Sequence, residues 1–214
     1  MLPDFTIAQL VARLVVLAVA FSVHEFAHAW TANYFGDDTP KLQGRLTLNP
    51  IVHIDPLGAL LLVVAGFGWA RPVMVNPHAL ERRSPAAPML VALAGPLSNL
   101  LLAIVAAIPV QAGLTRPGPA SSSFLPTAFQ LIDEFVFINL LLMLFNLIPL
   151  APLDGEKVLT YFLPPSGQAF MEQLRPYGPL LLMALIFVAP LVGIDLLSIL
   201  IGRPIRSLYF LLLG

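Results

Sequence analysis

The stretch Phe21-Ser22-Val23-His24-Glu25-Phe26-Ala27-His28 places three ionisable side chains within five residues, inside an apolar run from about residue 5 to residue 35. In a helix, residues four apart lie on one face about a turn apart, so His24 and His28 can reach one metal ion and Glu25 can act on a water there. Such groups are costly at membrane depth unless they pair, bind metal or face a polar cavity. We expect a helical metal site suited to hydrolysis, as in zinc peptidases. The alternative is two hydrogen-bonded core histidines with a buried glutamate between them.

The composition indicates an integral membrane protein. Of the 214 residues, 58% are hydrophobic and only 11% are charged, which is unlike a soluble globular domain. The formal net charge of -1 provides no basic surface for nucleic acid, so no nucleic-acid partner is expected. Because the chain has no cysteine, any metal must be held by histidine and carboxylate side chains.

Apolar runs predict an all-α polytopic membrane protein with about four to six membrane helices. Full spans are expected over residues 5–35, ending near Gly36, and over 84–115, which carries no charge. Shorter spans are expected over 135–148 and 179–194, whereas the pattern leaves open whether the tail 196–214 crosses. We expect one domain over 1–214, with the core motifs in 21–158 and a C-terminal span and tail in 176–214.

Between the first two spans the pattern is not helical. Apolar or small and polar residues alternate in 42–49, which predicts a half-buried strand, and prolines exclude a helix interior in 69–77. Together they predict a short membrane-associated β-sheet. The dozen or so apolar residues in 56–68 are too few for a full crossing of about 20 residues and favour a re-entrant segment.

Four further polar residues are candidates for the site. Asp154 follows two prolines in four residues, so it is presented on irregular backbone and suits a third metal ligand. Asn99 and Asn146 could bind substrate through their amides, or could satisfy a carbonyl freed where a helix is broken. His53 could act as a gate near the metal, or sit at the membrane interface bonded to a turn carbonyl or to Asp55.

Four motifs in this order resemble the site-2 proteases, a family of intramembrane zinc metalloproteases that cut transmembrane helices. They are His24-Glu25-x-x-His28, Gly95-Pro96-x-x-Asn99, Asn146-x-x-Pro149 and Asp154-Gly155. The resemblance implies one zinc ion per chain, held by His24, His28 and Asp154, with Glu25 as general base. It also implies a transmembrane protein substrate and a minimal form without a PDZ or CBS domain. An edge strand at 42–48 could pair with the opened substrate.

A different class of function, a metal or ion transporter using the same His, Glu and Asp cluster, also fits intramembrane ionisable residues. The oligomeric state cannot be read from the sequence.

We expect the protein to lie in a prokaryotic cell membrane. The depth of the metal ligands and the placement of charge predict how it is oriented there. One metal needs His24, His28 and Asp154 at one depth, which a full crossing at 56–68 would prevent, since roughly 30 Å of hydrocarbon would separate them. With 56–68 returning to its own side, one face gathers Lys41, Arg45, Arg71, Arg82, Arg83, Lys157 and Arg175. Positive charge favours the cytoplasm, so the site is expected to open toward the cytoplasmic side.

Overall fold

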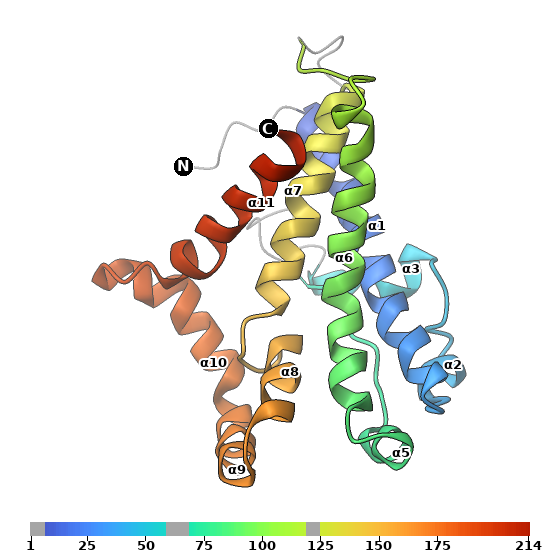
Figure 1. The fold of residues 1–214 in the computed structure, drawn as a ribbon, viewed down its shortest axis with the longest axis vertical. Helices are drawn as coiled ribbons and strands as arrows, with labels where there is room; N and C mark the ends of the chain where they lie inside the picture. The colour runs from blue at the N-terminus through green and yellow to red at the C-terminus, as the bar shows by residue number, and fades with distance from the viewer. Residues whose placement is uncertain (1–6, 59–68, 119–124) are drawn as a thin grey trace.

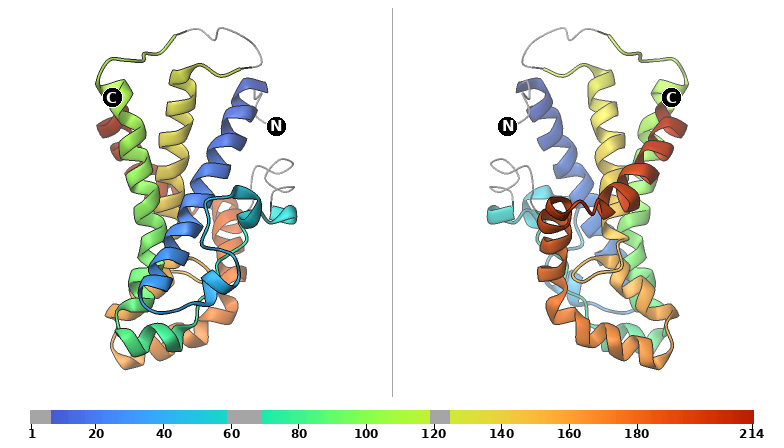
Figure 2. Two further views of the ribbon diagram at one scale, coloured as in Figure 1. Left: turned by 90° about the vertical axis from the view of Figure 1, so that its right-hand side faces the viewer. Right: turned by 90° about the vertical axis from the view of Figure 1, so that its left-hand side faces the viewer.

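Long apolar helices dominate the computed structural model, which describes residues 7–58, 69–118 and 125–214. Helices α1 (Ile7–Tyr34), α6 (Ala87–Gln111) and α7 (Ala128–Asn146) run side by side in alternating directions (Figures 1 and 2). These three helices and the helical stretch Pro165–Val192 are long and apolar enough to cross a membrane. Four such spans confirm the prediction of a helical membrane protein with four to six membrane helices.

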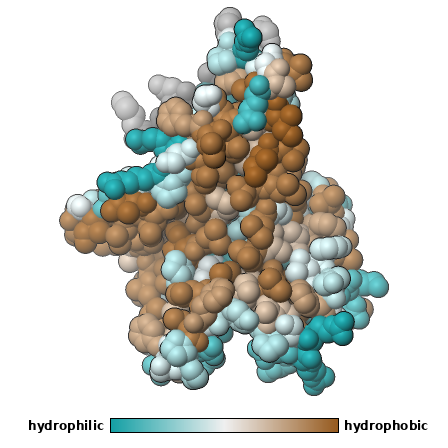
Figure 3. All heavy atoms as spheres, viewed as in Figure 1, coloured by the Kyte–Doolittle hydropathy of each residue, from teal (hydrophilic) through white to brown (hydrophobic). Residues whose placement is uncertain are grey.

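Small side chains allow the long helices to pack closely. Ala20 and Ala32 on α1 and Ala103 and Ala107 on α6 are each at most 1% exposed. Alanine at these positions lets helix backbones approach, as is common between membrane helices. Figure 3 shows apolar atoms over most of one face, with the strongest hydrophilic colour at its periphery.

The chain between α1 and α6 leaves and returns at one end of the bundle (Figure 1). Helix α1 ends at Tyr34 and Gly36 adopts a φ of 87°, the left-handed conformation that terminates helices, as the sequence predicts. Three short helices follow in the described part of this segment: α2 (Thr39–Leu42), α3 (Pro50–His53) and α5 (Pro77–Arg83). Because α1 ends and α6 begins at the same end of the bundle, His24, His28 and Asp154 can lie at one depth, as a single metal site requires.

The predicted strand at 42–49 is wrong. Leu42 ends helix α2, Gly44 has a φ of 67°, and the Arg45 N–H donates to the Pro40 carbonyl, so local turns satisfy this backbone. The proline in the first turn of α2 and the left-handed glycine outweigh the alternating pattern.

The predicted β-sheet is therefore also wrong, because residues 7–58, 69–118 and 125–214 contain no strand. Segment 71–76 is non-helical, as expected, but the pairing is a single antiparallel bridge between Ile54 and Ala70. Most of the predicted re-entrant segment, 59–68, lies outside the described residues.

Helix α7 begins at Ala128, earlier than the predicted Phe135, because its polar first turns have partners. Thr127 and Gln130 form a reciprocal capping box. Farther along, Glu134 accepts a hydrogen bond from Arg13 of α1, and Asp133 accepts one from the Tyr209 hydroxyl.

The C-terminal part folds back along the bundle. Helices α8 (Asp154–Phe162), α9 (Pro165–Leu174) and α10 (Gly178–Met183) lie beyond the end of α7, followed by irregular helical turns. The last helix, α11 (Arg203–Leu213), packs against α6 and α7 through Ile205. With 11 residues, α11 is shorter than the roughly 20 residues of a membrane crossing.

Candidate active site

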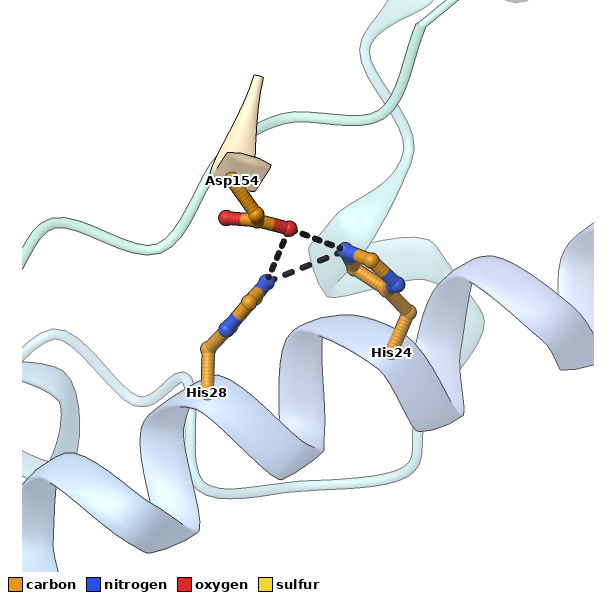
Figure 4. Close-up of side chains that lie close together, drawn as sticks. All are labelled: His24, His28 and Asp154. Atoms are coloured by element: carbon orange, nitrogen blue, oxygen red, sulfur yellow. Dashed lines mark hydrogen bonds and ion pairs between the residues drawn. The ribbon is translucent and has the colours of Figure 1, made fainter. Parts of the chain in front are cut away.

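Three predicted metal ligands meet where α1 faces the first residue of α8 (Figure 4). His24 Nε2 and His28 Nε2 lie 3.0 Å apart, and Asp154 Oδ2 lies 3.3 Å from the first and 3.2 Å from the second. All three residues are at most 9% exposed. In the described part of the chain this is the only group of three or more such side chains close enough to share a metal ion.

Hydrogen bonds on the far side of each imidazole determine which nitrogen faces the cluster. His24 Nδ1 lies 2.6 Å from Asn99 Oδ1, and His28 Nδ1 lies 2.7 Å from the Val91 carbonyl. Because the Val91 carbonyl can only accept, His28 Nδ1 is protonated, and in the neutral ring Nε2 carries a lone pair.

A buried chain of amides assigns the proton on His24. Asn99 Nδ2 donates to the Ala20 carbonyl at 3.4 Å and to Asn139 Oδ1 at 2.8 Å, and Asn139 Nδ2 donates to the Phe135 carbonyl at 2.8 Å. Since both carbonyls only accept, Asn99 Oδ1 must face His24 and receive the Nδ1 proton. Asn99 and Asn139 are fully buried. This relay links α1, α6 and α7, and it leaves His24 Nε2 as a lone pair too.

The donor set fits zinc. Two imidazole nitrogens and a carboxylate oxygen face one another within 3.3 Å, an arrangement that a bound cation makes favourable. Ligands at about 2.0–2.1 Å from a tetrahedral zinc ion are about 3.3 Å apart. The separations of 3.0 to 3.3 Å are close to that value, and the donor types are those of catalytic zinc sites.

Two glycines permit the close approach of the helices at this point. A Cβ added to Gly95 of α6 would lie 2.4 Å from His28 Nε2 and 2.6 Å from His24 Cε1. A Cβ on Gly155 would lie 2.3 Å from the Leu147 carbonyl oxygen. Gly95 therefore lets α6 approach the two histidines, and Gly155 lets the start of α8 approach the turn after α7.

Glu25 is held by the segment that precedes α5. It is 8% exposed, and its Oε2 accepts a hydrogen bond of 2.9 Å from the Val73 backbone N–H. The described residues provide no hydrogen bond to Oε1, so this oxygen remains available to accept a proton. The partner of Glu25 comes from an extended segment that sequence patterns do not connect to α1.

Asn146 and His53 make no hydrogen bond to the three donors in the described residues. Asn146 is half-buried at the end of α7, and its Nδ2 donates to the Leu142 carbonyl at 2.9 Å. His53 is 1% exposed, with Nε2 2.8 Å from the Thr47 carbonyl and Nδ1 without a partner in the described chain. The Thr47 contact is the turn-carbonyl bond considered for His53, whereas its role as a gate stays a prediction. A substrate-binding role for Asn99 also stays a prediction, although the structure gives that amide three protein partners.

Sequence reasoning missed Asn139 and Val73. The signal for Asn139 was its depth in an apolar run, where a carboxamide must find a protein partner. Val73 contributes only its backbone, so no side-chain pattern could have indicated it.

Comparison with known proteins identifies relatives along most of the chain. The chain is 44% identical over 178 residues to YwhC of Bacillus subtilis, and the match covers 83% of this chain and 80% of the relative. It is 32% identical to Rip2 of Mycolicibacterium smegmatis, covering 81% of this chain and 65% of the relative. Both carry the name "Putative zinc metalloprotease". No family model and no solved structure matches the chain. From its identity to YwhC over four-fifths of that protein, the chain belongs to this family of zinc metalloproteases.

Proposed function

We propose that this zinc metalloprotease is a site-2 protease that hydrolyses peptide bonds within or near transmembrane segments of membrane-protein substrates. The observation that carries the proposal is the buried donor cluster, because two of its members lie on α1, a helix long enough to span the membrane. A peptidase site at that depth has access to segments that soluble proteases do not reach. The order of the four sequence motifs supports the same family.

The geometry supports the proposed ligand roles. His24 and His28 would hold zinc through Nε2, and Asp154 would hold it through Oδ2. When bound, zinc polarises a carbonyl as a Lewis acid and lowers the pKa of water toward about 7. The relay through Asn99 and the bond to the Val91 carbonyl keep each ring in the tautomer and orientation that ligation needs.

Glu25 acts as the general base. The Val73 N–H holds Oε2 in place, so the carboxylate presents Oε1 to the attacking water, takes its proton and returns it to the departing amine. Asn146, half-buried at the end of α7, has an amide oxygen without a partner in the described residues and can accept a backbone N–H of the opened substrate. The substrate must unwind locally, since a transmembrane helix hides its carbonyls in hydrogen bonds.

We further propose that the site opens toward the cytoplasm. The donors meet at Asp154, the first residue of α8, and α8 lies in the half of the bundle where α5 and α9 are found (Figures 1 and 2). Of the positive residues predicted for the cytoplasmic face, Arg82 and Arg83 lie on α5 and Lys157 lies on α8, in that half.

The test is Glu25→Gln in purified, zinc-loaded protein with a model transmembrane substrate. Glutamine keeps the size and the Val73 contact but cannot accept the proton, so cutting should fall by about 10²-fold or more while zinc stays near one per chain. Zinc is measured by atomic emission and cutting by fragment mass. Full activity in this variant removes Glu25 from the mechanism, and absence of cutting by the unaltered protein on every transmembrane substrate contradicts the proposed substrate class.

A further inference from the structure

A cleft of about 650 Å³ opens beside the segment that holds Glu25. One wall comes from the turn after α2 and from α3, with Gln43 and Arg45, and the other from Arg71 and Met74. Helices α2 and α3 both pack against α1, the helix that carries the two histidines and Glu25 (Figure 2).

Two arginines line this cleft without a carboxylate partner. Arg45 is only 6% exposed, and its Nη1 donates to the Val52 carbonyl. In the described chain no carboxylate lies within ion-pair distance of Arg45 or Arg71, and segment 59–68 contains no acidic residue. Burial and the neighbouring Arg71 charge both lower the pKa of Arg45, whereas the Glu25 charge raises it. A buried guanidinium beside a second one is costly unless an anion joins them.

The cleft has a direct backbone connection to the proposed base. The Arg71 N–H donates to the His53 carbonyl at 2.8 Å, and two residues later the Val73 N–H donates to Glu25 at 2.9 Å. Extended backbone advances about 3.3 Å per residue, so Arg71 precedes the Glu25 contact at Val73 by about 7 Å along this segment. An anion bound by the arginines would therefore lie within a few peptide residues of the reacting bond.

We propose that Arg45 and Arg71 form a subsite for an acidic side chain of the peptide substrate, a few residues from the bond that is cut. This inference rests on the proposed function, since it names a preference of the same site. A peptide carboxylate is favoured over a lipid headgroup because the wall that carries Arg71 is the segment bonded to Glu25. Bidentate geometry suits guanidinium and carboxylate, and charge-assisted hydrogen bonds of this kind are strong.

The experiment measures peptide binding to zinc-loaded Glu25→Gln protein in phosphatidylcholine nanodiscs. Eight fluorescent transmembrane peptides each carry a single Asp, which is moved along eight successive positions of the series. Each peptide has a twin with Asn in place of that Asp. At one or two positions the Asp peptide should bind about 10-fold more tightly than its twin. Adding Arg71→Gln should abolish that difference, and Arg71→Glu should transfer the preference to a Lys peptide at the same position. Arg82→Gln, an exposed arginine of α5 that does not line the cleft, is the matched control and should leave the difference unchanged.

Three results would overturn the subsite. The first is equal binding of Asp and Asn peptides at all eight positions. The second is an Asp preference that survives in both Arg71→Gln and Arg45→Lys. The third concerns phosphatidylglycerol that stays bound to the purified protein, measured by native mass spectrometry. If Arg71→Gln loses this lipid but keeps the Asp preference, the cleft binds a lipid headgroup and not the peptide.

Cutting by protein with Glu25 intact, measured on the same peptides, separates the two proposals. Cutting without any Asp preference refutes the subsite alone. An Asp preference in binding with no cutting refutes the proposed function and leaves an acidic-peptide site.

Discussion

Replacement of Gly95 by alanine tests whether helix contact determines the metal site. The added Cβ would lie 2.4 Å from His28 Nε2, and real Cβ contacts are not found below 3.0 Å, so the imidazole or α6 must move by at least 0.6 Å. Metal-ligand distances tolerate only about 0.2 Å. We therefore expect zinc affinity to fall about 10- to 100-fold, the range seen when ligand positioning is lost. Alanine raises helix propensity by about 1 kcal/mol over glycine, so any loss must come from the collision.

Zinc affinity is measured by competition with a chromophoric chelator, and folding by circular dichroism of the same preparation. Gly202→Ala is the matched control, because its Cβ would meet only the Ser198 side chain, at 3.3 Å or more, and none of the donors. That variant should keep the zinc affinity of the unaltered protein. If Gly95→Ala binds zinc as tightly as the control, the helix contact does not govern the site and the reasoning is refuted.

Further expected outcomes concern the ligands, the relay and the topology. Asp154→Ala should lose bound zinc and activity together, and stoichiometric zinc of unchanged affinity would exclude ligation. Asn139→Leu should lower zinc affinity about 10-fold by freeing the His24 ring, whereas Asn146→Leu should reduce cutting without changing zinc affinity; equal zinc affinities would exclude the relay. Since the chain has no cysteine, Gly118→Cys should label with an impermeant thiol reagent in intact cells while Ser166→Cys should not. Both sites are exposed, and the reverse labelling pattern would contradict the proposed orientation.

Local patterns predicted the helices well where hydrophobicity and helix signals agree. The end of α1 follows from Gly36, and the span over α6 follows from an uncharged run. The prediction failed at 42–49, where eight residues of alternation were too few to outweigh Pro40 and Gly44. It also began α7 late, because the partners of Asp133 and Glu134, Tyr209 and Arg13, are remote in sequence.

The sequence by itself determined the chemistry of the site. Histidines four residues apart share a helix face whatever the fold, and without cysteine the third ligand had to be a carboxylate such as Asp154 or a further histidine. Tertiary structure decided how those donors are held. Asn99 bonds to His24 although 75 residues of chain separate them, and Asn139, a further 40 residues along, bonds to Asn99. Val73 approaches Glu25 through its backbone alone. Helical periodicity is a short-range property, whereas these partners meet only because α1, α6 and α7 pack together, so their pairing is absent from any local pattern.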